Sequence, residues 1–374
     1  MRVALVHYWL LNRRGGEKVL EAICRLFPEA DIFTLFYAPE NVSPVIRSHN
    51  VRASYLNPLR KAYRGLLPLM PMALESFDLR DYDLVISSES GPAKGVLTQS
   101  TTSHVCYCHT PMRYLWEHYP AIRAEAPPLA RPFLDALASY LRTWDFSTAA
   151  RVDQFIANST NVKRRIRKTY RRRSRVVYPP VATHLFRHET PQDYCLTVGE
   201  LVSYKRFDYV VRQFAGTGRK LKVVGDGPRY RELRRMAKPN IEFCGRVSDE
   251  DLESLYARCT AFIAPGEEDF GIATVEALAS GKPVVALARG GSLEIVGSGC
   301  GVFYDEPVEH SLAEALVTLD RIAHEIEPER TQSQAALFSE SEFNRRFLSA
   351  LKPSNQTESR ASRKPVKALN WKTA

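Results

Sequence analysis

Two glutamates, Glu268 and Glu276, lie eight residues apart around the predicted start of a helix. The apolar run 261–264 before them is typical of a strand, so the backbone N–H groups near residues 270–272 would be unpaired where the helix begins. Such a helix start binds anions. Because eight residues span a little over two helical turns, both carboxylates face one cleft only if Glu268 lies in the loop before the helix.

Acidic side chains beside an anion site suit a ligand that also carries hydroxyl groups. A nucleotide sugar has both parts, a diphosphate and the hydroxyls of its ribose and hexose. Acidic residues early in a helix are also favoured by the helix dipole in any α/β protein. The spacing of the two glutamates by itself leaves both interpretations open.

The run from Glu268 to Glu276 resembles a segment of the retaining glycosyltransferases of family 4, which have the GT-B fold. Other segments also resemble the same family and occur in the right order along the chain: Gly199-Glu-Leu-Val-Ser-Tyr-Lys205-Arg206, Val224–Pro228, Gly245–Asp249 and Gly290–Glu294. The resemblance covers most of residues 1 to about 330. It implies two Rossmann-like, doubly wound domains that face each other across a cleft.

The resemblance also implies a role for individual residues. Glu268 would hold the hexose and oppose its developing positive charge, Lys205 would stabilise the leaving diphosphate, and His109 would reach the transferred sugar. The implied donor-binding residues are Gly199, Lys205, Arg206, Gly225, Gly227, Phe270, Gly271, Ile272 and Glu276. On the acceptor side, the expected residues are Gly15, Gly16, Glu17 and His109.

One position departs from the family pattern. This chain has Glu200 directly after Gly199, where the family usually has Arg. The departure removes one expected contact with the diphosphate, so Arg206 becomes a candidate substitute beside Lys205. A surface cation at a helix start is the alternative interpretation of Arg206.

The segment Cys108-His109-Thr-Pro-Met-Arg-Tyr-Leu-Trp-Glu117 resembles O-antigen and exopolysaccharide mannosyltransferases of the same family. It implies transfer of mannose or a related hexose from a GDP-linked donor to a lipid-linked saccharide. A UDP-sugar-dependent transferase and a sugar-nucleotide epimerase of the same fold are the alternatives. A dehydrogenase fits less well, because no Gly-x-Gly-x-x-Gly follows the first predicted strand.

No metal cofactor is expected. Residues 81–83 and 249–251 have the Asp-x-Asp pattern of metal-dependent transferases, but such triplets arise easily by chance. Cys106 and Cys108 would share one face of a strand, yet no second Cys/His pair with zinc spacing accompanies them. The seven cysteines are expected to be reduced and mostly buried.

Alternating strand and helix signals predict an α/β protein with parallel sheets. Strands are predicted at 3–7, 32–35, 84–87, 104–108, 154–157 and 175–178, and then at 194–198, 220–224, 241–244, 261–264, 283–287 and 301–304. A polar linker at 181–193 separates an N-terminal acceptor-binding domain (1–180) from a C-terminal nucleotide-sugar-binding domain (194–350). Residues 353–374 are expected to form a disordered basic tail. Ligands bind at the carboxyl ends of such strands, which places the site in the interdomain cleft.

The net charge of +10 is concentrated in two segments, 163–175 with nine basic residues and no acidic one, and the tail. Residues 56–74 also interleave Arg60, Lys61 and Arg64 with apolar residues and prolines. Both features favour contact with an anionic membrane surface. A solvated helix face and a loop packed on its own domain are the alternatives.

No apolar run reaches the roughly 20 residues that cross a bilayer, and residues 1–7 are typical of a first strand. The chain is therefore expected to be cytoplasmic and peripheral on the inner face of the cell membrane. A polyanion-binding protein that uses residues 163–175 is the alternative from another class. Nucleic acid is not an expected partner, because no aromatic sheet motif or zinc knuckle is present.

Overall fold

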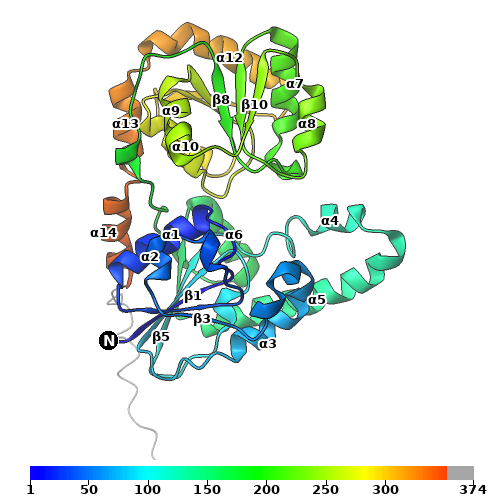
Figure 1. The fold of residues 1–374 in the computed structure, drawn as a ribbon, viewed down its shortest axis with the longest axis vertical. Helices are drawn as coiled ribbons and strands as arrows, with labels where there is room; N and C mark the ends of the chain where they lie inside the picture. Colours follow the sequence, from blue (N-terminus) through cyan, green and yellow to red (C-terminus); the bar gives the residue numbers. More distant parts are fainter. Residues whose placement is uncertain (352–374) are drawn as a thin grey trace, which may run out of the picture.

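The computed structural model describes residues 1–351, which form two α/β domains, one above the other in Figure 1. The first domain has a parallel sheet in the order β3-β2-β1-β4-β5-β6-β7, with strands β1 (Val3–His7), β2 (Asp31–Thr34), β3 (Val51–Ala53), β4 (Leu84–Glu89), β5 (Ser103–Cys108), β6 (Gln154–Ala157) and β7 (Ser174–Val176). The second has a parallel sheet in the order β10-β9-β8-β11-β12-β13, with strands β8 (Cys195–Val198), β9 (Leu221–Val224), β10 (Ile241–Gly245), β11 (Ala261–Ala264), β12 (Val284–Leu287) and β13 (Gly301–Tyr304). The predicted fold class is confirmed, and β3 is a strand that the sequence pattern did not indicate.

Helices cover both faces of each sheet. The helices of the first domain are α1 (Gly15–Leu26), α2 (Pro44–Arg47), α3 (Met70–Glu75), α4 (Tyr119–Glu125), α5 (Arg131–Thr148) and α6 (Thr160–Tyr170), of which α4 and α5 extend away from the sheet (Figure 1). In the second they are α7 (Phe207–Thr217), α8 (Tyr230–Met236), α9 (Asp249–Arg258), α10 (Ile272–Ala279), α11 (Ser292–Ile295), α12 (Glu309–Ile322) and α13 (Pro328–Ala336). Successive side chains of a strand point to opposite faces, so Leu5 of β1 packs with α1 while Ala4 and Val6 pack with α3. This two-sided burial explains why the strands are almost continuously apolar.

Each sheet reverses its strand order near the middle. β1 lies between β2 and β4, and β8 lies between β9 and β11. Open parallel sheets bind ligands at the carboxyl ends of the strands beside such a reversal. In this chain both reversals open toward the space between the two domains.

Helix α14 (Glu340–Leu351) packs on the first domain, whereas the sequence analysis assigns residues 194–350 to a single C-terminal domain. Phe343 and Phe347 are buried in the cluster that contains Leu5. Their ring centroids lie 5.9 and 6.1 Å from that of Tyr107. The predicted boundary is therefore wrong at its C-terminal end, because this amphipathic helix buries its aromatic face in the first domain.

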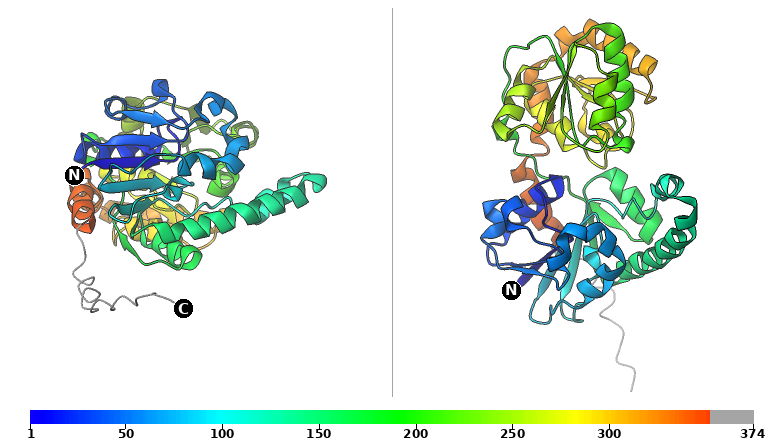
Figure 2. Two further views of the ribbon diagram at one scale, coloured as in Figure 1. Left: turned by 90° about the horizontal axis from the view of Figure 1, so that it is seen from below. Right: turned by 45° about the vertical axis from the view of Figure 1, so that its right-hand side comes forward.

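Residues 56–74 form η2 (Asn57–Leu69), a broken 3₁₀ helix, and most of α3. Leu56, Met70 and Leu74 are buried, while Leu59 and Met72 are exposed. Beyond this segment, α4 and α5 form an arm that projects from the first domain in all three ribbon views (Figures 1 and 2). Residues 56–74 are thus packed on their own domain through one face and expose apolar groups on another.

The seven cysteines are free thiols and all but Cys244 are buried, as expected. No helix within residues 1–351 is both long and apolar enough to span a membrane. The predicted tail, 353–374, lies outside the described residues.

Candidate active site

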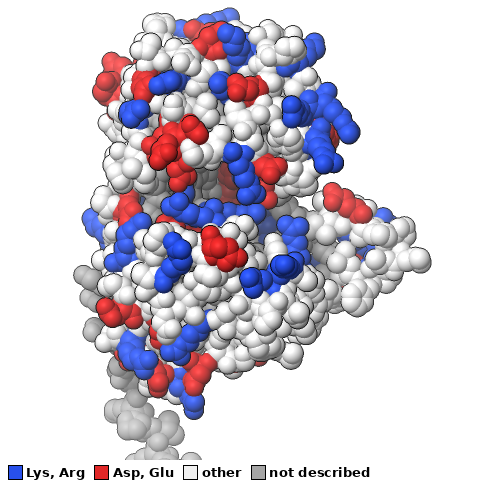
Figure 3. All heavy atoms as spheres, viewed as in Figure 1, with Lys and Arg blue, Asp and Glu red and all other residues white. Residues whose placement is uncertain are grey.

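A cavity of about 340 Å³ lies between the domains. Several residues that line it directly follow strands, four in the first domain (Tyr8, Ser90, His109 and Asn158) and two in the second (Gly199 and Pro265). Figure 3 shows the hollow between the domains, with Lys and Arg side chains along the rim that the first domain forms. The cavity lies where the doubly wound sheets predict a ligand site.

Lys205 and Glu268 form an ion pair at the wall of this cavity, with 2.9 Å between Nζ and Oε1. Burial lowers the pKa of Lys205, but its ion pair and hydrogen bond with Glu268, with smaller contributions from Tyr204 and Glu200, outweigh it, so the pKa lies above its ordinary value. Lys205 is therefore a cation at neutral pH. The two predicted catalytic residues of the second domain thus meet in one place.

Two helices begin at the cavity. Gly271, in the left-handed region at φ 113°, leads into α10, and Phe270, Gly271 and Ile272 all line the cavity as predicted. Helix α1 begins opposite, at Gly15 and Gly16, which also line the cavity. A Cβ on Gly15 would lie 2.9 Å from Ile272 Cδ1, so glycine permits this close approach. Two helix N-termini at one cavity favour an anionic ligand.

The loop before α10 is held by Gly290 and Gly291. The N–H of Gly291 donates to the carbonyl of Glu268 at 2.9 Å. A Cβ on Gly291 would lie 1.9 Å from the carbonyl oxygen of Phe270, and one on Gly290 would lie 2.4 Å from that of Glu268. The glycine pair therefore sets the position of the Glu268 loop through close backbone packing.

His109 follows β5 and lines the cavity from the first domain. Its Nε2 lies 3.0 Å from the hydroxyl of Ser88. Burial, together with the neighbouring His7, lowers the pKa of His109 to about 3. His109 is consequently a neutral imidazole that can hydrogen-bond a sugar hydroxyl.

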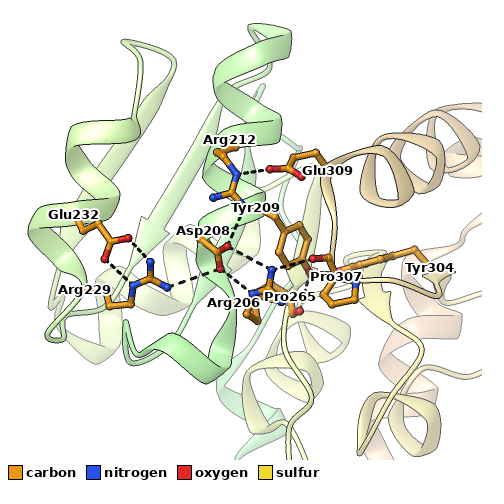
Figure 4. A network of polar contacts seen from close by, with 10 residues as sticks. All are labelled: Arg206, Asp208, Tyr209, Arg212, Arg229, Glu232, Pro265, Tyr304, Pro307 and Glu309. Carbon is orange, nitrogen blue, oxygen red and sulfur yellow. Dashed lines mark hydrogen bonds and ion pairs between the residues drawn. The ribbon is translucent and has the colours of Figure 1, made fainter. Parts of the chain in front are cut away.

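Arg206 is not brought into the cavity. Its Nε donates to Asp208 at 3.0 Å and its Nη2 donates to the carbonyl of Pro307 at 3.1 Å. Asp208 is held in turn by Arg212, which belongs to the network in Figure 4. This arrangement does not support a contact of Arg206 with the diphosphate, because its guanidinium serves to position the start of α7.

Three other predicted donor residues lie outside this cavity. Glu276 lines a neighbouring cavity of about 230 Å³, where Lys18 and Tyr256 bind its two oxygens at 3.2 and 3.1 Å. A Cβ on Gly225 would lie 1.9 Å from the carbonyl oxygen of Gly199, and one on Gly227 would lie 2.6 Å from that of Leu201. These two glycines allow the turn after β9 to pack on the loop after β8.

Glu17 is likewise not an exposed acceptor contact. Its Oε2 accepts the backbone N–H of Arg14 at 2.9 Å, which caps the start of α1. Its side chain is buried, and its Oε1 lies 3.7 Å from Nε2 of His7. Glu17 therefore stabilises the glycine turn, whereas Gly15 and Gly16 form the wall of the cavity.

The first Asp-x-Asp triplet lies away from the cavity, where Asp81 and Asp83 pair with residues 1 and 2. Within residues 1–351, no group of three or more His, Cys, Asp or Glu is arranged to hold a metal ion. Cys106 and Cys108 pack in an apolar cluster with Phe155.

Asp269 joins the two domains, a role that the sequence analysis missed. Its carboxylate accepts from Arg165, and from Arg113 at 3.2 Å, and its carbonyl accepts from Ser159 at 2.6 Å. Its position directly after Glu268 is a local signal, but its partners lie more than a hundred residues away. Tyr8, Ser90 and Asn158 were also missed. Tyr8 and Asn158 directly follow predicted strands, whereas the strand before Ser90 extends two residues beyond its predicted end, to Glu89.

The basic segment 163–175 is partly structural. Arg165 is buried and binds Asp269, while Arg172 donates to the carbonyls of Ala149 and Val152 at 2.6 Å each. Seven other basic residues are exposed and make no ion pair within residues 1–351: Lys163, Arg164, Arg167, Lys168, Arg171, Arg173 and Arg175. The segment therefore retains a cationic surface smaller than its composition suggests.

Two facing doubly wound domains, with the ligand cavity between their strand reversals, define the GT-B class of glycosyltransferases. The family model described as Glycosyltransferase Family 4 matches residues 13–185, and the model described as Glycosyl transferases group 1 matches residues 192–320. The chain belongs to the family 4 glycosyltransferases.

Individual relatives match part of the chain. An uncharacterised glycosyltransferase of Methanocaldococcus jannaschii is 28% identical over 173 residues, which make up 45% of this chain and 49% of that relative. A GDP-mannose-dependent alpha-mannosyltransferase of Corynebacterium glutamicum is 35% identical over 103 residues, 27% of this chain and 25% of the relative. The chain thus matches half or less of the length of these relatives.

Solved structures match over nearly the whole chain. Anabaena HepE in complex with UDP has a TM-score of 0.68 at 16% identity, covering 94% of this chain and 99% of that one. Sucrose-phosphate synthase from Thermosynechococcus elongatus has a TM-score of 0.70 at 16% identity, covering 97% and 100%. At this identity the likeness shows the shared fold.

Proposed function

We propose that this chain is a retaining glycosyltransferase in cell-surface polysaccharide synthesis. It moves mannose or a related hexose from a GDP-linked donor to a lipid-linked saccharide. The observation that carries the proposal is the Lys205–Glu268 ion pair in a cavity that also contains His109 and the start of α10. A cation and a helix N-terminus suit a diphosphate, and a carboxylate suits sugar hydroxyls.

In the proposed reaction the bond from the anomeric carbon to the diphosphate breaks, and the acceptor hydroxyl bonds to the same face of that carbon. Lys205 and the N–H groups at the start of α10 stabilise the leaving diphosphate. Glu268 opposes the positive charge on the sugar ring, and His109 contacts a sugar hydroxyl. The acceptor proton passes to a departing phosphate oxygen.

A Glu268→Gln variant tests this role. We expect kcat to fall by about 100-fold or more, because a charge that acts in the transition state is lost. The Kd for GDP should change by less than about threefold. Glu250→Gln is the control, since Glu250 is exposed at the start of α9. Equal losses in kcat and in nucleotide affinity would contradict the assignment.

The donor nucleotide is tested by thermal shift with GDP, UDP, ADP and TDP, with and without Mg²⁺. The GDP-mannose-dependent relative supports GDP, and the UDP in the HepE structure supports the uridine alternative. The proposal includes no metal cofactor, so we expect a shift with GDP alone that persists in EDTA. Conversion of a nucleotide sugar without any acceptor would favour the epimerase alternative.

We also propose a peripheral position on the inner face of the cell membrane. The arm exposes Leu129 and Phe133, whose relative exposures are 97% and 74%, and η2 exposes Leu59 and Lys61. Such apolar groups enter the headgroup boundary while cations meet lipid phosphates.

Cosedimentation with vesicles tests this position. Binding to phosphatidylglycerol-containing vesicles should exceed binding to phosphatidylcholine vesicles, and Leu129→Ser with Phe133→Ser should reduce it. Salt-dependent nucleic-acid binding through the exposed cations of 163–175, without any response to sugar nucleotides, would instead favour a polyanion-binding protein.

A further inference from the structure

Glu200 places a negative charge beside the site where the donor diphosphate is proposed to bind. It follows Gly199, which lines the cavity, and it stands where related enzymes usually have Arg. Its carboxylate raises the pKa of Lys205, so it acts electrostatically on the predicted phosphate-binding cation. An unpaired carboxylate there would repel a diphosphate.

The structure pairs this carboxylate with a cation from the opposite domain. Arg14 Nη1 lies 3.3 Å from one oxygen of Glu200, and Nη2 lies 3.4 Å from the other. Both side chains are partly exposed, at 56% and 36%. Arg14 immediately precedes α1, and its backbone N–H is held by Glu17, so the turn that presents the guanidinium is structurally defined.

We propose that Arg14 supplies the phosphate-binding cation that this chain lacks at position 200, and that Glu200 positions it across the cleft. The inference rests on the proposed function. A guanidinium has five N–H donors, and Glu200 engages two of them. The others remain for phosphate oxygens, in the planar geometry that suits bidentate binding. Arg14 is thus a donor-binding residue, and Glu200 is a positioning residue.

The remainder of α1 supports this arrangement. Lys18, one turn after Arg14, binds Glu276 of the second domain at 3.2 Å, and Arg13 binds Asp249 at 3.2 Å. Basic residues at the start of α1 therefore face acidic residues across the cleft, as Figure 3 shows along its rim. A donor held by Lys205 from one side and Arg14 from the other links its binding to the approach of the two domains.

Charge reversals distinguish this role from a simple ion pair between domains. Arg14→Glu should raise the KM for GDP-mannose and the Kd for GDP by about tenfold or more, because a charge-assisted contact is lost. Glu200→Arg breaks the same pair but restores a cation at the usual position, so both constants should stay within about threefold of wild type. In the double variant, Arg14→Glu with Glu200→Arg, both constants should also return to within about threefold of wild type, because the introduced arginine again supplies a cation. All three should change kcat less than KM.

Two outcomes would overturn the inference. Equal harm from the two single reversals, with recovery in the double variant, would show that the pair only joins the domains. Unchanged constants in Arg14→Glu would show that Arg14 does not bind donor. Glu294→Gln is the control for loss of an interdomain contact, since its carboxylate accepts the N–H groups of Thr160 and Asn161 at 2.7 and 3.0 Å.

The proposed function is judged separately on the wild-type protein. If the wild type binds none of the nucleoside diphosphates tested, the proposed function itself fails. If the wild type binds UDP in place of GDP, the same variants are measured with UDP and UDP-glucose, with the same expected ratios. If the wild type binds and Arg14→Glu binds equally well, only the inference about Arg14 fails.

Discussion

The protonation states of two side chains define the character of the cavity. Lys205 remains a cation because its interaction with Glu268, above all, outweighs the effect of burial on its pKa. His109 remains neutral because burial and His7 lower its pKa to about 3. At neutral pH the cavity therefore contains both a cation that can bind phosphate and a neutral imidazole that can bind a hydroxyl group.

A second buried histidine predicts how stability depends on pH. Burial lowers the pKa of His104 to about 4, and its Nε2 lies 2.9 Å from the hydroxyl of Ser87. The unfolded chain takes up this proton below about pH 6.5, whereas the folded chain resists until about pH 4. The contribution of His104 to the free energy of unfolding is therefore fully present above about pH 6.5. It decreases between about pH 6.5 and pH 4, by up to about 1.4 kcal/mol per pH unit.

Urea unfolding of wild type and His104→Gln at pH 7 and pH 5 measures this effect. The variant should have a smaller difference between the two pH values, whatever its stability at pH 7. His310→Gln, at an exposed position, should retain the wild-type difference. An unaltered pH dependence in His104→Gln would exclude this histidine as the cause.

Among the elements, the loop between β11 and α10 is the one whose position matters most to the site. It carries Glu268 and Asp269, and it is packed against the backbone of Gly290 and Gly291. Asp269 then ties it to Arg113 and Arg165 of the first domain. The loop is thus positioned from both sides, as a preorganised site requires.

A methyl group at Gly291 should displace this loop. We expect Gly291→Ala to destabilise the fold by about 1 to 3 kcal/mol, because the new Cβ would meet the carbonyl of Phe270. The value of kcat/KM should fall even at temperatures where the variant is fully folded, since Glu268 would be displaced from its position in the cavity. Thermal unfolding and kcat/KM provide the measurements.

Gly216→Ala is the matched control. Gly216 lies in α7 with no atom within 4 Å of an added Cβ. Alanine there should change stability by less than about 1 kcal/mol, toward higher helix propensity. Wild-type stability and kcat/KM in Gly291→Ala would contradict the prediction that close packing at Gly291 sets the position of the Glu268 loop.

At the scale of the whole molecule, the chain returns to its first domain at the end of the described residues. Val181 and Ser339 form a parallel bridge where the chain passes between the domains, and α14 then packs beside Leu5. Arg25 of α1 binds Glu340 at the start of this helix at 2.9 Å. The core of the first domain therefore depends on residues near position 350.

This dependence can be measured by hydrogen exchange. Phe347→Ala should cost about 3 to 5 kcal/mol, because a fully buried aromatic ring is removed. Amide protection should fall in β1 and β5, far away in sequence, and remain in β8 to β13. Leu348→Ala, on the exposed side of α14, should change neither the stability nor the amide protection of the first sheet. Loss of protection in the second sheet alone would contradict the assignment of α14.

Local patterns were sufficient for much of the fold and for part of the site. Buried parallel strands are short apolar runs bounded by polar turns, and the predicted strands are found for this reason. His109 directly follows β5, and Lys205 and Glu268 lie in loops that connect a strand to the next helix, so their convergence follows from the topology of the sheets. The fold class and the cavity position thus follow from short-range patterns.

Contacts between distant residues were decided by the tertiary structure alone. Arg14 and Glu200 are 186 residues apart, and Arg165 and Asp269 are 104 apart. Helix α14 packs on the first domain, although the whole second domain lies between them in the sequence. The residues next to a charged side chain in the sequence do not indicate which group it will bind. Arg206, for example, was predicted to line the cavity but binds Asp208 and the carbonyl of Pro307. The sequence determined where strands and helices begin, because backbone pairing and apolar burial act locally. Which charges neutralise one another depends on how the two sheets come together.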